Sequence, residues 1–227
     1  MKKYAIFDLD DTLLDFTRGE TEGITAILKK YGAPDVQRGF DTYVHLNREI
    51  WQRIEQGAPR QPLLNERFAL TFNALGIAVD GVALEAEYND MLNHNFYTLP
   101  GARRLLDHLK TAGVQLLIGT NGTKHTQLSR LAGSGIGTYF DGVYISQDIG
   151  FNKPDPRFFA PIFAQHPDLT AANTLMVGDR LQSDILGANN VQLPSIWYNP
   201  QHTTNPGTYQ PTFEAADFAT VTRLVLA

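Results

Sequence analysis

The segment FDLDDTL places three carboxylates within four residues, at Asp8, Asp10 and Asp11, directly after an apolar run at residues 4–6. Neighbouring carboxylates repel one another and raise one another's pKa unless positive charge lies between them. Such a group either spreads into solvent as turn residues and helix caps, or it holds a cation. Polar residues elsewhere in the chain help to decide between these interpretations.

Three more segments place polar side chains at the ends of apolar runs. Thr120 and Asn121 follow the run at 114–119, Lys153 follows the run at 143–145, and Asp179 follows the run at 175–178, with Asp184 shortly after it. Each residue alone has an ordinary explanation as a turn, cap or solvated side chain. If the runs are parallel strands, however, their carboxyl ends share one edge of a sheet, which is where open α/β sheets bind ligands.

The residues that would meet at this edge suit a metal ion and a phosphate group. Asp8, Asp10 and Asp179 offer the oxygen ligands that Mg²⁺ takes together with waters and phosphate oxygens. Thr120 and Lys153 offer hydrogen-bond donors and positive charge for a phosphate. A divalent cation among the acids would explain why they tolerate one another.

Elements that could position these residues follow from the hydrophobic pattern. Apolar runs predict strands at residues 4–7, 114–118, 143–145, 175–177 and 195–198, and helical patterns lie between most of them. This alternation is typical of an α/β fold with a Rossmann-like parallel sheet. The polar stretch 199–211, rich in Pro, Gly and Thr, predicts a long surface loop.

Residues 16–97 have a different pattern, with four helical stripes and no convincing strand. Apolar residues recur at helical spacing, for example at Ile24, Ile27, Leu28 and Tyr31. We therefore predict an inserted α-helical, four-helix-type cap domain at 16–97. The α/β core would comprise residues 1–15 and 98–227 and would hold the catalytic site.

Composition limits the possible partners of this chain of 227 residues. The net charge of −5 offers no basic surface for a nucleic acid polymer or an anionic membrane, which predicts a small-molecule substrate. The absence of cysteine excludes disulfides and thiol catalysis. No run approaches transmembrane length and no leader is evident, so we expect a cytoplasmic protein. The sequence sets no oligomeric state.

Taken together and in order, the motifs resemble those of the haloacid dehalogenase (HAD) superfamily, in its subclass I with a helical cap. The resemblance rests on the segments Asp8-Leu9-Asp10-Asp11-Thr12, Thr120-Asn121-Gly122, Lys153-Pro154 and Gly178-Asp179 with Asp184. It implies a Mg²⁺-dependent phosphatase in which Asp8 is the nucleophile that forms an aspartyl-phosphate. Asp10 would be the general acid and then the general base. Dehalogenases of this superfamily typically lack that second acid, so its presence favours phosphoryl transfer.

The same resemblance implies roles for the remaining motif residues. Asp8, the backbone carbonyl of Asp10, and Asp179 would bind Mg²⁺. Thr120, Asn121 and Lys153 would bind the transferring phosphoryl group. Asp184 would support Lys153 or the waters on the metal.

The segments NREIWQRIEQG, NERF, MVGDRLQSDILGANN and WYN resemble the YjjG-type pyrimidine 5′-nucleotidase family. This resemblance implies activity on pyrimidine nucleoside monophosphates and makes Asn47, Trp51 and Arg67 candidate substrate residues in the cap. The indole of Trp51 could stack on a base. The alternative interpretations are packing for Trp51 and a paired surface charge for Arg67.

Several other functions remain open on the sequence. The motifs also fit a broad-specificity sugar-phosphate or phosphoglycolate-type phosphatase, a phosphomutase, or a catalytically idle relative that serves as a binding module. A phospho-receiver domain also uses an acidic pair, an acceptor aspartate, a threonine and a lysine. Its acceptor aspartate ends a later strand, however, whereas the strand before Thr120 is followed by no aspartate.

Overall fold

The computed structural model describes all residues, 1–227, and the chain forms two compact units. One unit comprises Met1–Asp15 and Phe96–Ala227, and the other comprises Phe16–Asn95. The first is an α/β unit and the second is entirely helical. Each is described separately below.

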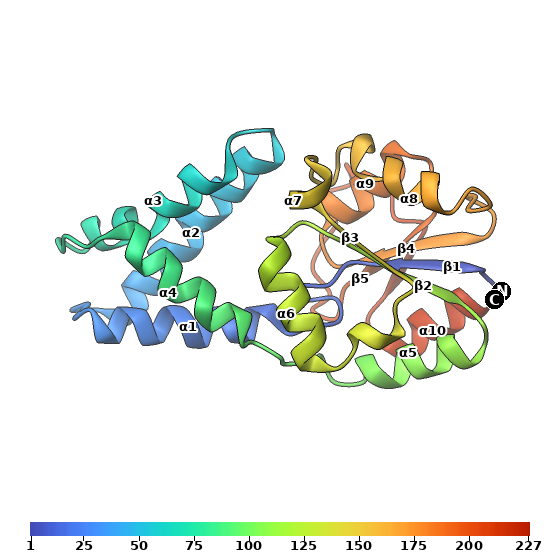
Figure 1. Ribbon diagram of the computed structural model, residues 1–227, viewed down its shortest axis with the longest axis horizontal. Coiled ribbons are helices and arrows are strands. Elements are labelled where there is room, and N and C mark those ends of the chain that lie inside the picture. The colour runs from blue at the N-terminus through green and yellow to red at the C-terminus, as the bar shows by residue number, and fades with distance from the viewer. The chain divides into compact units, whose positions relative to one another are not determined.

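The α/β unit is built on one six-stranded sheet in the order β3-β2-β1-β4-β5-β6, and all its neighbouring strands are parallel (Figure 1). The strands are β1 (Tyr4–Phe7), β2 (Gln115–Thr120), β3 (Gly142–Ile145), β4 (Thr174–Gly178), β5 (Ser195–Tyr198) and β6 (Phe213–Ala215). Phe7 of β1 pairs with Ile118 of β2 on one side and with Val177 of β4 on the other. The residue after β1, Asp8, therefore emerges between the ends of two other strands.

Both faces of this sheet are covered, which explains why its strands read as continuous apolar runs. Figure 1 shows α5 (Ala102–Thr111) and α10 (Phe218–Leu226) on one face, and α8 (Ala160–Gln165) and α9 (Leu186–Asn190) on the other. Alternate residues of β1 point to opposite faces: Phe7 belongs to the apolar cluster with α5 and α10, and Ile6 to the cluster with α8 and α9. The predicted α/β parallel-sheet fold is confirmed.

Shorter elements complete the α/β unit. They are α6 (Lys124–Ser134), α7 (Ser146–Ile149), two 3₁₀ turns, η1 (Gly137–Tyr139) and η2 (Pro156–Phe158), and a π-helical turn, η3 (Leu181–Ile185). Strand β6 was not predicted, because it has three residues and two of them, Phe213 and Glu214, are exposed. A strand this short and exposed has no apolar pattern in the sequence that would predict it.

The helical unit contains α1 (Phe16–Lys30), α2 (Val36–Glu55), α3 (Arg60–Asn73) and α4 (Gly81–Asn93). Two of these helices begin at capping aspartates: Asp35 accepts a hydrogen bond from the backbone N–H of Arg38, and Asp80 accepts from the first turn of α4. The apolar stripes form a main cluster that includes the buried rings of Tyr43 and Tyr88, and a smaller one around Ile50 and Leu63. This packing gives the unit a hydrophobic core of its own.

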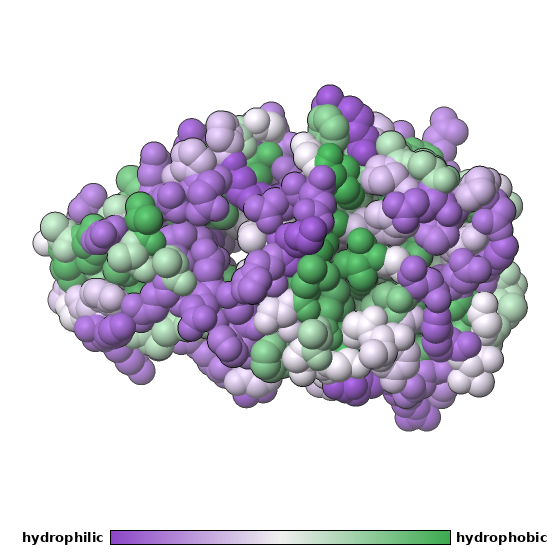
Figure 2. All heavy atoms as spheres, viewed as in Figure 1, coloured by the Kyte–Doolittle hydropathy of each residue, from purple (hydrophilic) through white to green (hydrophobic).

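Hydrophilic side chains predominate on the face of the molecule that Figure 2 shows. The large apolar residues that are exposed come from both units, Leu70 and Val82 from one and Leu128 and Phe213 from the other. None of the helices is both long enough and apolar enough to cross a membrane.

Candidate functional site

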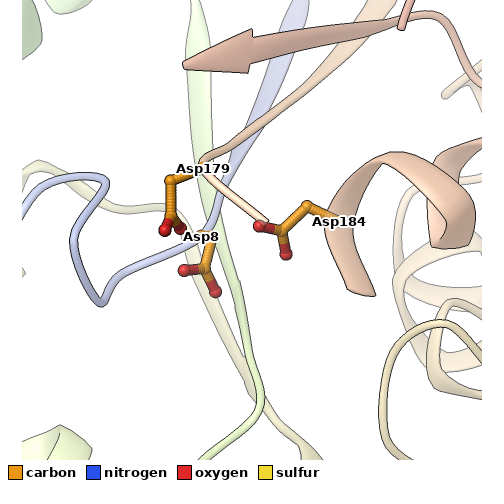
Figure 3. A group of neighbouring side chains, drawn as sticks. All are labelled: Asp8, Asp179 and Asp184. Carbon is orange, nitrogen blue, oxygen red and sulfur yellow. The ribbon is translucent and has the colours of Figure 1, made fainter. Parts of the chain in front are cut away.

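Three carboxylates converge at the carboxyl ends of the central strands (Figure 3). Asp8 follows β1, Asp179 follows β4, and Asp184 lies in η3; one oxygen of each lies within 4.8 Å of the others. Gly178 makes the approach of Asp184 possible, because a Cβ at this position would lie 2.3 Å from the Asp184 Oδ2. A side chain larger than hydrogen at 178 would therefore displace that carboxylate.

Lys153 lies among these acids and is only 1% exposed. Its Nζ donates hydrogen bonds to Asp8 Oδ1 and to Asp184 Oδ1, each at 2.7 Å, and to the backbone oxygen of Gly119 at 2.5 Å. An ammonium group has three donors, and all three are used. The contacts fix the position of the Lys153 side chain relative to Asp8.

The electrostatics of the cluster favour a further cation. Burial raises the pKa of Asp8 to about 7, and the charge of Lys153 only partly opposes this effect. Burial, together with the charges of Asp184 and Asp8, also raises the pKa of Asp179 well above its usual value. Burial disfavours the charged form of Lys153, but Asp184 and Asp8 outweigh it and raise the pKa of that ammonium group. Three carboxylates face a single ammonium here, so a divalent cation would relieve their repulsion.

The donor set fits a hard cation such as Mg²⁺, which takes carboxylate oxygens. Asp184 is engaged elsewhere, since its Oδ1 accepts from Lys153 and its Oδ2 accepts from the backbone N–H of Arg180 at 3.0 Å. Asp8 and Asp179 are therefore the better placed ligands. The side chain of Asp10, which was predicted to bind the metal through its backbone carbonyl, contacts Gln127 and Arg130 of α6.

Two residues that the sequence analysis did not assign hold Asp179 in place. Thr12 is fully buried; its hydroxyl lies 3.2 Å from Asp179 Oδ1 and accepts the backbone N–H of Asp179 at 3.1 Å. The indole Nε1 of Trp197 donates to the backbone oxygen of Asp179 at 2.8 Å. Thr12 is the last residue of the first motif, and this position in the motif is the feature of the sequence that could have identified it as a site residue.

Thr120 and Asn121, both predicted as phosphate ligands, differ in their surroundings. Thr120 ends β2, is 1% exposed, and its hydroxyl accepts a hydrogen bond from Gln127 at 2.9 Å. The side chain of Asn121 contacts the backbone of Lys153 twice: its Nδ2 donates to the Lys153 oxygen and its Oδ1 accepts the Lys153 N–H, both at 2.8 Å. The Asn121 side chain therefore anchors the loop that carries Lys153.

Helix α6 supplies two site residues that the sequence analysis missed. Gln127 donates from Nε2 to Asp10 Oδ2 at 2.8 Å, and Arg130 forms an ion pair with Asp10 Oδ1 through Nη1. Both side chains are buried although they are polar. The signal in the sequence was a pair of polar residues three positions apart, which lie on one side of a helix.

The candidate substrate residues of the helical unit contact one another or their own apolar cluster. Arg67 is 4% exposed and forms a two-point ion pair with Glu85, at 2.6 and 2.9 Å, and its Nη1 donates to Asn47 at 3.0 Å. The alternative interpretation of Arg67 as a paired surface charge was correct in the pairing and wrong in the placement, because the pair is buried. Trp51 is partly buried against the cluster that contains Ile50 and Leu63, and the guanidinium of Arg60 lies 5.5 Å from the centre of its ring.

Comparison with known proteins identifies the family of the chain. The family described as haloacid dehalogenase-like hydrolase matches residues 2–192. The chain belongs to this family and is therefore an enzyme of the hydrolase class; the predicted superfamily resemblance is confirmed.

The chain is similar to two pyrimidine 5′-nucleotidases and to one crystal structure of a HAD hydrolase. The chain is 40% identical to the pyrimidine 5′-nucleotidase PynA of Streptococcus pneumoniae over 217 residues, which covers 95% of this chain and 92% of PynA. It is 30% identical to the pyrimidine 5′-nucleotidase YjjG of Escherichia coli, with 98% and 97% of the two chains covered. The crystal structure of the HAD-hydrolase YfnB of Bacillus subtilis bound to magnesium is similar with a TM-score of 0.91 at 31% identity, over 100% of both chains.

Proposed function

We propose that this enzyme is a Mg²⁺-dependent phosphatase that hydrolyses small phosphomonoesters, and that its substrates are pyrimidine nucleoside 5′-monophosphates. The observation that carries the proposal is the cluster in which Asp8, Lys153 and Asp179 meet at the strand ends. The similarity to PynA and YjjG, both described as pyrimidine 5′-nucleotidases, supports the choice of substrate.

In the first step the carboxylate of Asp8 attacks the phosphorus atom, and the bond between phosphorus and the ester oxygen breaks. Asp10 donates a proton to the departing alkoxide, so that the nucleoside leaves as a neutral alcohol. The product on the enzyme is an aspartyl-phosphate at Asp8. The Lys153 contact at 2.7 Å holds the attacking side chain in one orientation during this step.

In the second step water attacks the phosphorus of the aspartyl-phosphate, and Asp10 accepts a proton from that water. The carboxylate of Asp8 is released together with inorganic phosphate, which restores the enzyme. The Thr120 hydroxyl provides a donor for the phosphoryl oxygens in both steps, and Lys153, whose three donors contact Asp8, Asp184 and Gly119, provides positive charge beside them. A Mg²⁺ ion bound by Asp8 and Asp179 would neutralise charge on the transferring group.

Several groups are needed because phosphomonoester hydrolysis requires acceleration by up to ~10²¹-fold. A single acid–base residue supplies about 10²–10⁴ of that factor. The remainder must come from covalent catalysis, charge neutralisation and positioning acting together. The four segments at the strand ends offer one set of residues for each of these contributions.

We assign substrate selection and the role of a lid to the helical unit, as a cap on the catalytic unit. Within it, Trp51 is the better candidate for base stacking, because Arg67 and Asn47 are joined in a buried network with Glu85. Base stacking on an aromatic ring tolerates different bases, so Trp51 would supply affinity more than selectivity. The substrate is a small molecule, and no nucleic acid polymer is required.

Phosphate release from nucleoside monophosphates, sugar phosphates and p-nitrophenyl phosphate, with Mg²⁺ and with EDTA, tests the proposal. We expect Mg²⁺-dependent release that is highest with uridine and thymidine monophosphates. A profile that favours sugar phosphates would retain the phosphatase and reject the nucleotidase. Absence of release with every ester would favour the phosphomutase or the idle binding module instead.

A further inference from the structure

Helix α6 contacts the carboxylate of Asp10 at both oxygens. Gln127 Nε2 donates to Oδ2 at 2.8 Å, and Arg130 Nη1 is paired with Oδ1. The same Arg130 nitrogen donates to Gln127 Oε1 at 3.1 Å. The three side chains therefore form a closed ring of hydrogen bonds, in which rotation of the Asp10 carboxylate would break two contacts at once.

The ring extends to the proposed phosphate-binding residue Thr120. Gln127 Nε2 donates to the Thr120 hydroxyl at 2.9 Å as well as to Asp10. One amide nitrogen thus touches both the proposed acid–base residue and a proposed phosphate ligand. A shift of Gln127 would move or release both.

The α6 side chains are deeply buried, whereas the carboxylate they hold is not. Arg130 is 0% exposed and Gln127 is 2% exposed, while the side chain of Asp10 is 26% exposed. A guanidinium group loses solvation on burial and is stabilised there only by well-placed acceptors. The arrangement leaves Asp10 accessible to a reactant while its orientation is set from the buried side.

The loop before α6 is shaped to admit Gln127. A Cβ on Gly122 would lie 2.7 Å from Gln127 Cγ and 2.7 Å from its Nε2, which is closer than such atoms approach. The absence of a side chain at 122 therefore lets Gln127 reach between Thr120 and Asp10. This steric requirement is independent of the hydrogen bonds.

We propose that Gln127 and Arg130 are positioning residues, which orient the carboxylate of Asp10 for proton transfer and couple it to Thr120. The inference rests on the proposed function, specifically on the role of Asp10 as general acid. It assigns two residues of α6 to the reaction, with Gln127 holding Asp10 Oδ2 and Arg130 holding Asp10 Oδ1.

The proposal has a signature that a purely structural role lacks. A nucleoside 5′-oxygen is a poor leaving group and needs the proton of Asp10, whereas p-nitrophenolate departs without one. The ratio kcat/KM reports the steps up to the departure of the alcohol, so it isolates this proton transfer. Misorienting Asp10 should therefore lower kcat/KM for a nucleotide far more than for the aryl ester.

The experiment measures kcat/KM of the full-length enzyme with Mg²⁺ for uridine monophosphate and for p-nitrophenyl phosphate. The variants are Gln127→Met and Arg130→Met, which keep the length of each stem, and Arg130→Lys, which keeps the charge. Leu128→Ala, an exposed position on the same helix at 42%, is the matched control. Circular dichroism and thermal unfolding verify that each variant is folded.

For Arg130→Met we expect a loss on the order of 10²-fold with the nucleotide, the cost of misplacing a catalytic group, and less than about threefold with the aryl ester. Gln127→Met also removes the contact to Thr120, so we expect a nucleotide loss of the same order and a measurable aryl-ester loss that is about tenfold smaller. Arg130→Lys should recover part of this loss, and Leu128→Ala should match the wild type. Equal losses with both esters would overturn the proposal. If Arg130→Met does not fold, the losses of kcat/KM for the nucleotide and for the aryl ester are compared in Gln127→Met and Arg130→Lys instead.

Asp10→Asn separates failure of this inference from failure of the proposed function. In an Asp10→Asn background, Arg130→Met, or Arg130→Lys if that variant does not fold, should lower the nucleotide activity no further, because the residue that Arg130 positions no longer transfers a proton. A further loss of tenfold or more, the range of an independent catalytic contribution, would overturn the positioning role. Full activity of Asp10→Asn alone would instead reject the assignment of Asp10.

Discussion

Replacing Glu85 by Gln in the helical unit tests whether Arg67 is a structural residue. The two side chains, 5% and 2% exposed, join α3 to α4 through two hydrogen bonds. The guanidinium of Arg67 also lies 4.8 Å from the ring centre of Tyr88. Glu85→Gln preserves the shape of the side chain but leaves the buried positive charge without its counter-ion.

The expected magnitude follows from this burial. Removing one partner of a buried ion pair costs about 3–5 kcal/mol, and the retained amide oxygen places Glu85→Gln at the lower end, ~3 kcal/mol. Burial raises the pKa of Glu85 in spite of the nearby guanidinium, so for this carboxylate the attraction does not fully offset desolvation. Removing both charges in Arg67→Met with Glu85→Leu should therefore cost much less than the single change.

Urea unfolding measures the loss, and hydrogen exchange by mass spectrometry localises it to α3 and α4. The matched control is Glu22→Gln, which breaks the exposed pair of Arg18 and Glu22, with side chains 54% and 52% exposed. We expect little change in the control, because exposed pairs contribute little. A loss below about 1 kcal/mol for Glu85→Gln, the range of surface pairs, would refute the reasoning.

The remaining predictions concern the catalytic residues and the cap. Asp8→Asn should abolish turnover while the fold is retained, because an amide is not a nucleophile; steady-state phosphate release measures this. Gly178→Ala should lower kcat by at least about tenfold, since its Cβ would collide with Asp184 and release the carboxylate that holds Lys153. EDTA should abolish activity and Mg²⁺ should restore it. Trp51→Ala should raise KM for uridine monophosphate more than KM for p-nitrophenyl phosphate.

Specific results would contradict each of these expectations. Turnover by Asp8→Asn at the wild-type rate would remove Asp8 as nucleophile. Unchanged kinetics of Gly178→Ala would show that the position of Asp184 does not matter. Undiminished activity in EDTA would exclude the metal requirement, and equal effects of Trp51→Ala on the two esters would leave Trp51 with a packing role alone.

Local patterns in the sequence predicted most elements of the fold. The runs at residues 4–7 and 195–198 became strands with those bounds, and the four stripes of 16–97 each became a helix. These elements are set by the spacing of apolar residues over a few turns, which the sequence displays directly. Strand β6 escaped prediction because its three residues form no such pattern, and its pairing with β5 depends on a neighbour from another part of the chain.

The sequence by itself determined which chemical groups stand at the strand ends, since Asp8, Thr120, Lys153 and Asp179 each follow or end an apolar run. Only the tertiary structure decided what each group touches. Gln127 reaches Asp10 across 117 positions of sequence, and Arg67 meets a partner on a different helix. No periodicity encodes such contacts, because they depend on how complete elements pack, whereas the propensity to form those elements is local.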